Sequence, residues 1–328
     1  MPSRVDGPRA SRRLWTSITT RPWPAWFAAR GAAFAIGLIT WGLNRGNVFI
    51  DVTGYGRWAF GTLNGTAIPY RDFSWEYPPM ALPAMVGPAL ATALLPTLRY
   101  IPYLLAWILM VLAVDALIMR GVIRRVGTDL RQPALVLWIL GPPLLGALSW
   151  TRFDVFAAAA AFAAILFAGS SRWVASGAAA GLGATMKLWP SLLAPVQRTR
   201  GRAVLATALA GGVVVLVAGV TWVLTGSTGF SQVLAYQSDR GLQIESLAAL
   251  PLVWLNHLGV EGYGARFAYG AWEITGPGAE QLATAATVAF AIGLGVVFLL
   301  HWRLMRRDAG ARGVALTAVT LMLVILVT

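Results

Sequence analysis

Residues 100–119 read YIPYLLAWILMVLAVDALIM, a run that contains one charged side chain. A helix of about 20 apolar residues crosses the hydrocarbon core of a bilayer. Three other runs approach this length, namely Trp26–Leu43, Ala203–Thr225 and Gln281–Leu300. Hydrophobic residues make up 57% of the 328 positions and charged residues 12%, against roughly 25% charged residues in a soluble domain. We therefore predict an all-α polytopic membrane protein with about 8–10 membrane helices.

The net charge of +13 suggests nucleic-acid binding, but the positions of the charges argue against it. Of the 26 basic residues, 17 form four clusters, in residues 1–30, 120–131, 198–202 and 303–312. Such clusters between apolar runs are typical of cytoplasmic segments, and no basic patch alternates with aromatic residues. We expect a cytoplasmic N-terminus and no nucleic-acid partner. The ratio of 25 Arg to one Lys, together with abundant Ala and Gly, indicates a GC-rich bacterial genome. The expected location is the bacterial plasma membrane.

Prolines indicate which segment of the first outer loop does not cross the membrane. The first apolar run would deliver residues 45–77 to the outside. If residues 79–95 and 100–119 both crossed, the basic cluster at 120–131 would lie outside, against the charge rule. Residues 78–96 contain five prolines, which interrupt helical hydrogen bonding. We expect this segment to lie along the outer interface as a broken juxtamembrane helix.

The rest of the chain then alternates across the membrane, with spans expected at residues 134–150, 155–170, 203–225, 281–302 and 313–328. Residues 173–197 lie between Arg172 and Arg198, so we expect a short hairpin with Lys187 near its tip; a single crossing would invert everything that follows. This topology places nine of the thirteen acidic residues outside: Asp51, Asp72, Glu76, Asp154, Asp239, Glu245, Glu261, Glu273 and Glu280.

The domain organisation is expected to be simple. An Arg-rich cytoplasmic tail, residues 1–23, precedes one membrane domain, residues 24–328. The first apolar run is too long for the core of a signal peptide, so we interpret it as a retained helix. The chain ends at Thr328 within an apolar run, and we expect the domain to be truncated there. The absence of Cys excludes disulfides.

Asp51 is the first candidate for chemistry. It follows the first helix by a few residues, so its carboxylate is expected at the membrane surface, where a lipid-linked substrate presents its head group. There it could accept a proton from an attacking hydroxyl. The alternative is that Asp51 caps the helix that follows it.

Asp72 and Glu76 follow in the same loop. Four residues apart, they would share one face of a helix, where their repulsion would raise one pKa unless a cation such as Arg71 offset it. A solvated pair of loop carboxylates is the alternative. The neighbouring aromatic residues fit either a wall for sugar stacking or an interfacial aromatic belt: Tyr70, Phe73, Trp75 and Tyr77.

Two further cationic positions could bind phosphate. Arg152 and Asp154 form a short outward turn; they could pair with each other, or Arg152 could hold a phosphate by a bidentate contact. Lys187 lies within an apolar stretch. Placing a charged residue near the bilayer centre costs about 2.5–3.5 kcal/mol on insertion scales, so such residues usually serve a function. Its side chain could instead extend to the interface.

The second large outer region reads YQSDRGLQIES, residues 236–246. Arg240, Gln243 and Glu245 suit an anionic head group and sugar hydroxyls, although an ordinary polar loop has a similar composition. His257 and His301 lie far from any acidic cluster in sequence, so no metal site is indicated, and no Gly-rich nucleotide loop is present.

Taken together, these motifs resemble the bacterial C-type glycosyltransferases, and specifically the polyprenol-phosphate-mannose-dependent mannosyltransferases of glycosyltransferase family 87. The resemblance rests on five segments in order: Asp51 with Tyr55, Pro69–Asp72 leading to Glu76–Pro79, Arg152–Asp154, Gly183–Pro190, and Arg240–Ser246.

The resemblance implies a polytopic fold with juxtamembrane helices in the first outer loop. It also implies an inverting hexosyl transfer in which an Asp of that loop, Asp51, acts as general base. The implied substrates are a polyprenyl-phosphate sugar donor and a glycolipid or glycan acceptor of the cell envelope, with the active face extracytoplasmic. Substrate contacts are expected from Tyr55, Asp72, Glu76, Tyr77, Arg152, Asp154, Lys187, Arg240, Gln243 and Glu245. No cofactor is expected, and the sequence leaves a metal requirement open.

Two other classes remain. A transporter or flippase of a lipid-linked envelope intermediate would also have broken helices and intramembrane charges, but its carboxylates would lie at mid-membrane rather than in outer loops. An assembly partner without its own chemistry would not need the acidic loop. The sequence does not specify the sugar, the acceptor, the linkage or the oligomeric state.

Overall fold

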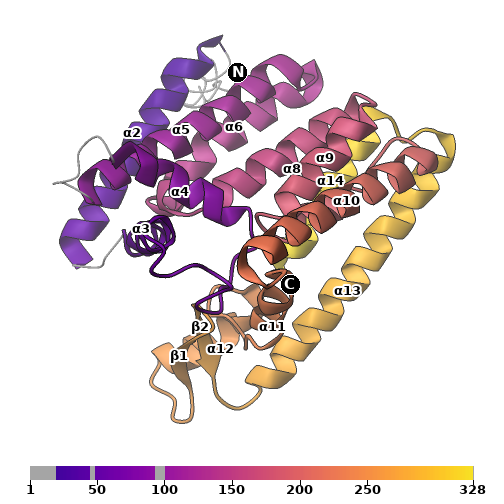
Figure 1. The fold of residues 1–328 in the computed structure, drawn as a ribbon. Coiled ribbons are helices and arrows are strands. Elements are labelled where there is room, and N and C mark those ends of the chain that lie inside the picture. The colour runs from indigo at the N-terminus through magenta and orange to yellow at the C-terminus, as the bar shows by residue number, and fades with distance from the viewer. Residues whose placement is uncertain (1–19, 45–48, 93–99, 328) are drawn as a thin grey trace, which may run out of the picture. The chain divides into compact units, whose positions relative to one another are not determined.

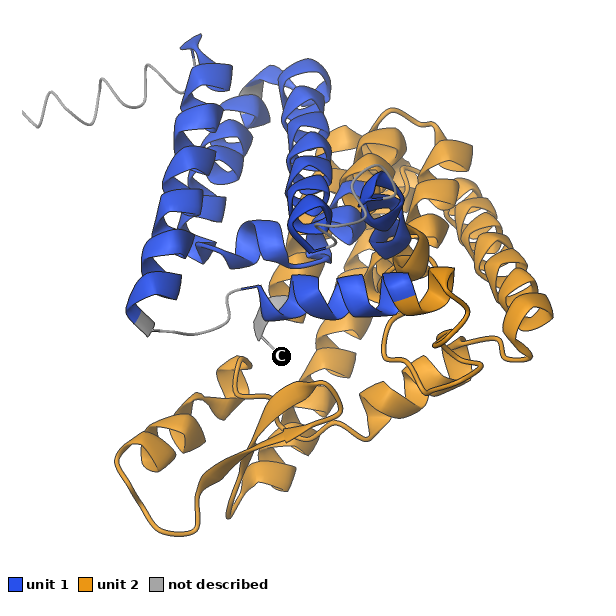
Figure 2. Ribbon diagram, turned by 60° about the vertical axis from the view of Figure 1, so that its left-hand side comes forward, with its two compact units in different colours: residues 1–60, 84–159 blue, residues 61–83, 160–328 orange. Residues whose placement is uncertain are grey.

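The computed structural model describes residues 20–44, 49–92 and 100–327, so most of the predicted tail, residues 1–23, lies outside the described residues. The chain divides into two compact units (Figure 2). Unit 1 comprises Met1–Phe60 and Ala84–Ala159, and unit 2 comprises Gly61–Pro83 and Ala160–Thr328.

Long apolar helices confirm the prediction of a helical membrane protein. Within the described ranges, four helices are long and apolar enough to span a bilayer: Pro22–Leu43, Tyr100–Arg125, Arg200–Thr225 and Ala279–Arg307. Five shorter apolar helices accompany them: Ala81–Ala91, Leu130–Leu145, Asp154–Gly169, Leu247–His257 and Gly310–Ile325. All four runs singled out in the sequence are helical.

Unit 1 contains α2 (Pro22–Asn44), α5 (Tyr100–Arg125), α6 (Thr128–Leu145), α7 (Leu148–Thr151) and the start of α8 (Asp154–Gly169). Between α2 and α5 come two short helices, α3 (Ile50–Leu63) and α4 (Ala81–Ala91). In Figure 1, α3 is seen end-on while α2 and α5 are seen from the side, so α3 runs across them. This is the arrangement expected of a juxtamembrane helix. The broken helix expected at 78–96 corresponds to α4, which contains Pro88.

A buried ion pair joins the long helices of unit 1. The Nε and Nη2 atoms of Arg30 on α2 donate to the carboxylate of Asp115 on α5. The same guanidinium donates to the carbonyl oxygens of Trp138 and Ile139 on α6, and it lies 5.4 Å from the ring centre of Trp26. Every nitrogen of this buried arginine therefore has an acceptor, as a charge between apolar helices requires.

Unit 2 contains α9 (Trp173–Ala184), η3 (Trp189–Leu193), α10 (Arg200–Thr225), α11 (Phe230–Ser238), η4 (Leu247–Ala249), α12 (Leu250–His257), α13 (Ala279–Leu304), η5 (Met305–Arg307) and α14 (Gly310–Val327). Helices α9 and α10 touch backbone to backbone, since a Cβ at Gly177 would lie 2.5 Å from the carbonyl oxygen of Ala206. The amide of Gln197 donates to Ser176 Oγ over 2.8 Å, which brings residue 197 back beside the start of α9. Residues 173–197 therefore fold back on themselves, as the predicted hairpin requires, while the membrane side of the two ends stays a prediction.

An antiparallel β-hairpin, which the sequence analysis did not predict, precedes α13. Strands β1 (Gly264–Ala268) and β2 (Ala271–Thr275) pair with Phe267 opposite Trp272. Backbone hydrogen bonds between Ile244 and Trp272 and between Ile274 and Leu242 add residues 242–244 to the outer edge of β2. A short, half-exposed hairpin has too weak an alternation of apolar residues to stand out beside long apolar helices.

Candidate active site

Asp51 lies in the first turn of α3. The free N–H groups of a helix N-terminus favour a carboxylate at this position, so the predicted role as a helix-start residue and the predicted role in catalysis are compatible. The next turn of the same helix is buried, with Tyr55 2% exposed and its ring 4.8 Å from that of Trp107 on α5. The buried face anchors α3 and leaves Asp51 at the partly exposed start of the helix.

Arg152 pairs with Asp51. Its Nε atom lies 2.9 Å from Asp51 Oδ2, and the two side chains are 40% and 31% exposed. Arg152 ends α7 and precedes α8, whose first residue is the exposed Asp154. The sequence offered Asp154 or a phosphate as the partner of Arg152. The structure shows Asp51 as a partner and so joins two of the five motifs, Asp51 and Arg152–Asp154, within unit 1.

Asp72 stabilises a turn rather than a helix. Its Oδ2 atom accepts from the backbone N–H of Ile68 over 2.8 Å, and Arg71 donates to both carboxylate oxygens. The Arg71 guanidinium lowers the pKa of Asp72. Residues 68–73 form a turn closed by a bridge between Pro69 and Phe73, so the helical spacing considered for Asp72 and Glu76 does not occur.

Glu76 pairs with Arg240 in unit 2. Glu76 Oε2 accepts from Arg240 Nη2 over 2.8 Å, and each side chain is 17% exposed. Arg240 Nε donates to the carbonyl of Tyr269, and Nη1 donates to Gln237 Oε1. All three guanidinium nitrogens are thus engaged, and a phosphate at Arg240 would have to replace one of these partners.

Glu273 holds the backbone of the Arg240–Ser246 motif, a role that the sequence analysis missed. This fully buried carboxylate accepts from the N–H of Gly241 over 2.7 Å and pairs with Arg266 at 2.9 Å. Gln243 forms a β-bridge with the same residue, whereas Glu245 is exposed. The sequence offered little to distinguish Glu273, because a single acidic residue in a short apolar stretch looks like any other loop carboxylate.

Lys187 follows α9 in a half-buried turn, with its backbone N–H bonded to the carbonyl of Gly183. In the same turn, the carbonyl of Thr185 accepts from the N–H of Met80 over 2.8 Å. This bond joins the segment that follows Glu76 and Tyr77 to the Lys187 motif within unit 2. Ahead of this segment, the hydroxyl of Tyr70 donates to the carbonyl of Tyr77.

Comparison with known proteins decides the family. Neither a curated protein nor a solved structure matches the chain. The sequence profile of glycosyltransferase family 87 matches residues 75–328. The match includes Glu76, Arg152, Lys187 and Arg240, while Asp51 lies ahead of it. It covers most of the chain and confirms the resemblance noted in the sequence. This membrane protein therefore belongs to glycosyltransferase family 87.

Proposed function

We propose that the protein transfers a hexose, mannose, from a polyprenyl-phosphate donor to a glycolipid or glycan acceptor of the bacterial cell envelope. The reaction takes place on the extracytoplasmic face of the plasma membrane and inverts the anomeric configuration. Membership of family 87 supports glycosyl transfer. The observation that carries the mechanism is the ion pair between Asp51 and Arg152 at the start of a helix that runs across its neighbours.

In the proposed reaction, Asp51 accepts the proton of an acceptor hydroxyl as the hydroxyl oxygen attacks the anomeric carbon. The bond from that carbon to the phosphate oxygen breaks, and polyprenyl phosphate leaves with the bonding electrons. A direct displacement of this kind needs a base on the acceptor side. Arg152 fixes the direction of the Asp51 carboxylate, and the partial exposure of both groups lets an acceptor reach them.

The leaving phosphate requires positive charge, because stabilising the charge that develops in the transition state is often the largest catalytic contribution. The family motifs of the sequence offer Arg240, Lys187 and Arg152 as candidate sources, of which Arg152 lies in the same unit as Asp51. Arg240 would exchange Glu76 for phosphate, a bidentate acceptor that suits its planar guanidinium. Lys187 has no such geometric demand and would act as a point charge.

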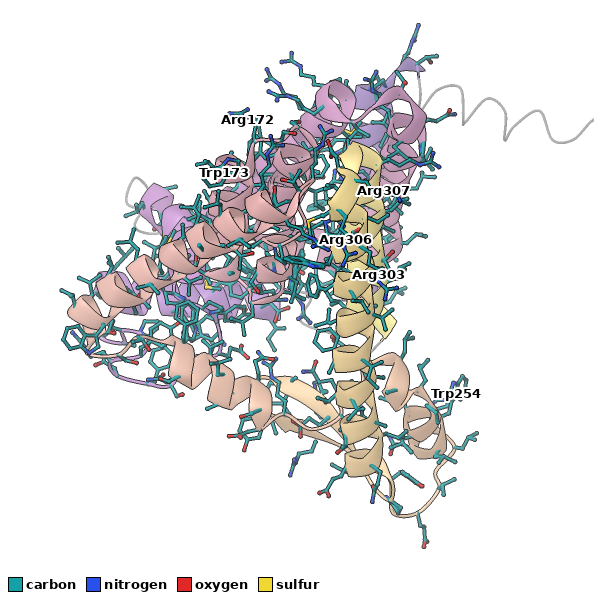
Figure 3. All side chains as sticks on the ribbon, turned by 90° about the vertical axis from the view of Figure 1, so that its right-hand side faces the viewer. Arg172, Trp173, Trp254, Arg303, Arg306 and Arg307 are labelled. Carbon is teal, nitrogen blue, oxygen red and sulfur yellow. The ribbon has the colours of Figure 1, made fainter. Side chains whose placement is uncertain are left out.

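The charges of unit 2 support the proposed active face. Arg200 on α10 donates to the carbonyl of Trp302 on α13, so the N-terminus of one long helix meets the C-terminus of the other. Figure 3 shows Arg303, Arg306 and Arg307 near the C-terminal end of α13 and Trp254 of α12 towards its N-terminal end. Residues 198–202 and 303–312 contain seven arginines and one acidic residue, Asp308. By the positive-inside rule this end is cytoplasmic, which leaves the hairpin end outside.

The test is transfer of labelled mannose from polyprenyl-phosphate mannose into membrane glycolipid. Asp51→Asn should lower turnover by about 10²-fold or more, the usual contribution of a general base. Glu261→Gln, which removes an exposed loop carboxylate, is the matched control and should retain turnover. Equal turnover in Asp51→Asn and the unsubstituted protein at matched expression would disprove the role of Asp51.

A further inference from the structure

The turn of the β-hairpin has an unusual residue. Tyr269 and Gly270 connect β1 to β2 with φ angles of 48° and 72°. Two-residue hairpin turns with positive φ at both positions favour Asn-Gly or Gly-Gly. A bulky side chain in the left-handed region is an outlier that costs conformational energy. Tyrosine is therefore a poor choice for forming this turn.

Contacts from Arg240 and Glu76 hold the turn in place. The carbonyl of Tyr269 accepts from Arg240 Nε over 3.0 Å. A Cβ at Gly270 would lie 2.0 Å from Glu76 Oε2, so the backbone of the turn lies directly against this carboxylate. A strained conformation persists only where its surroundings fix it, and such residues concentrate at functional sites.

The ring of Tyr269 remains available. Tyr269 is 41% exposed. Its ring packs edge-on against the ring of Tyr236, with the two ring centroids 5.9 Å apart and an interplanar angle of 89°. The backbone of the turn contacts Arg240 and Glu76, and Arg240 also bonds Gln237. A guanidinium, a carboxylate and an amide therefore lie beside the turn that carries the ring. All of these groups belong to unit 2.

This combination suits a sugar ring. A pyranose has an apolar face of C–H groups, which an aromatic ring can cover, and a rim of hydroxyls, which need donors and acceptors. Ligand sites combine an apolar surface with a few polar groups in this way. A second exposed aromatic pair on the hairpin, Phe267 and Trp272, serves as a comparison, because these two residues lie on the strands and not in the turn whose backbone contacts Arg240 and Glu76.

We infer that Tyr269 is the stacking surface of a pyranose subsite whose polar rim is formed by Glu76, Arg240 and Gln237. The inference deepens the proposed function, because it rests on a sugar being the substrate. A pyranose ring occurs both in the transferred hexose and in the acceptor glycan. Kinetics in which the donor and the acceptor are varied in turn will show which of the two sugars Tyr269 binds.

Three variants of the full chain separate stacking from folding. Tyr269→Asn creates an Asn-Gly turn, which forms this backbone more easily, so its melting temperature should equal or exceed that of the unsubstituted protein. Tyr269→Phe keeps the ring. Phe267→Asn removes another exposed ring from the same hairpin and serves as the control. Each variant is characterised in detergent by thermal unfolding before its binding is measured.

Binding is measured without turnover, by saturation-transfer NMR with methyl α-mannopyranoside, methyl α-glucopyranoside and methyl β-galactopyranoside. We expect Tyr269→Asn to lose the signal and the other two variants to retain it. In transfer assays, Tyr269→Asn should raise the KM for the donor or for the acceptor by about threefold to tenfold, the range of one aromatic contact, with kcat largely retained.

The inference is overturned if the unsubstituted protein binds none of these glycosides, or if Tyr269→Asn folds, binds them normally and keeps both KM values. A protein that binds a glycoside through Tyr269 but transfers no mannose would refute the proposed donor and leave the subsite established. The two failures are therefore distinguishable.

Discussion

The Nε atom of Arg152 lies 2.9 Å from Oδ2 of Asp51, which ties the turn between α7 and α8 to the first turn of α3. We expect Arg152→Gln to lower kcat by roughly 10²-fold, in the range seen when one electrostatic contact of a catalytic centre is removed. Arg152→Lys should recover part of the loss. Assays of labelled-sugar transfer, with Arg57→Gln as an exposed control on α3, would test this. Equal losses in Arg57→Gln would point to a general effect on α3.

The Arg30–Asp115 pair should dominate the stability of unit 1. Both side chains are less than a tenth exposed, and removing one partner of a buried pair costs about 3–5 kcal/mol. We expect Arg30→Met to be strongly destabilised and Arg30→Met with Asp115→Leu to recover much of the loss, because no buried charge remains unpaired. Thermal unfolding in detergent measures both. A double variant less stable than Arg30→Met would contradict the argument.

Gly270→Ala should damage the docking of the hairpin. The added Cβ would lie 2.0 Å from Glu76 Oε2 at a φ of +72°, where a side chain also carries backbone strain of order 1–3 kcal/mol. The melting temperature and the transfer rate should both fall. Gly211→Ala, on α10 with nothing within 4 Å of its new Cβ, is the matched control and should leave both unchanged.

Asp72 should stabilise its turn down to unusually low pH. Because the Arg71 guanidinium lowers the pKa of Asp72 from its ordinary value of 3.8, the stabilisation is complete above that value and is lost as the pH falls through the lowered pKa. The difference in melting temperature between the unsubstituted protein and Asp72→Asn should stay constant from pH 8 to about pH 5 and shrink below about pH 4. A difference that vanishes near neutral pH would show another cause.

The active face can be tested directly because the chain has no Cys. A single cysteine at Glu261, in the loop before β1, should react with a membrane-impermeant maleimide in intact cells. A cysteine at Arg306, in η5 directly after α13, should react only after permeabilisation, as the positive-inside rule requires. Labelling of both in intact cells, or the reverse pattern, would refute the proposed orientation.

Membrane class and the long helices could be predicted because they depend on local properties. A run such as residues 100–119 must form its hydrogen bonds within itself in lipid, so length and apolar composition are sufficient. The hairpin at 173–197 followed from arginines at its two ends, since each marks the same membrane side. The hairpin β1–β2 could not be predicted this way, because its two five-residue strands are too short for their alternation to be distinctive.

The sequence by itself determined the membrane class, the helical runs, the family motifs and the candidate residues of the site. Only the tertiary structure decided which of those residues pair: Asp51 with Arg152, Glu76 with Arg240, and Gly241 with the buried Glu273. Each pairing joins positions far apart in the chain, and no periodicity or composition encodes it. Such contacts form only when packed helices and the docked hairpin bring the partners within hydrogen-bonding distance. For the fully buried Glu273 the pairing is also required, because an unpaired buried carboxylate would strongly destabilise the fold.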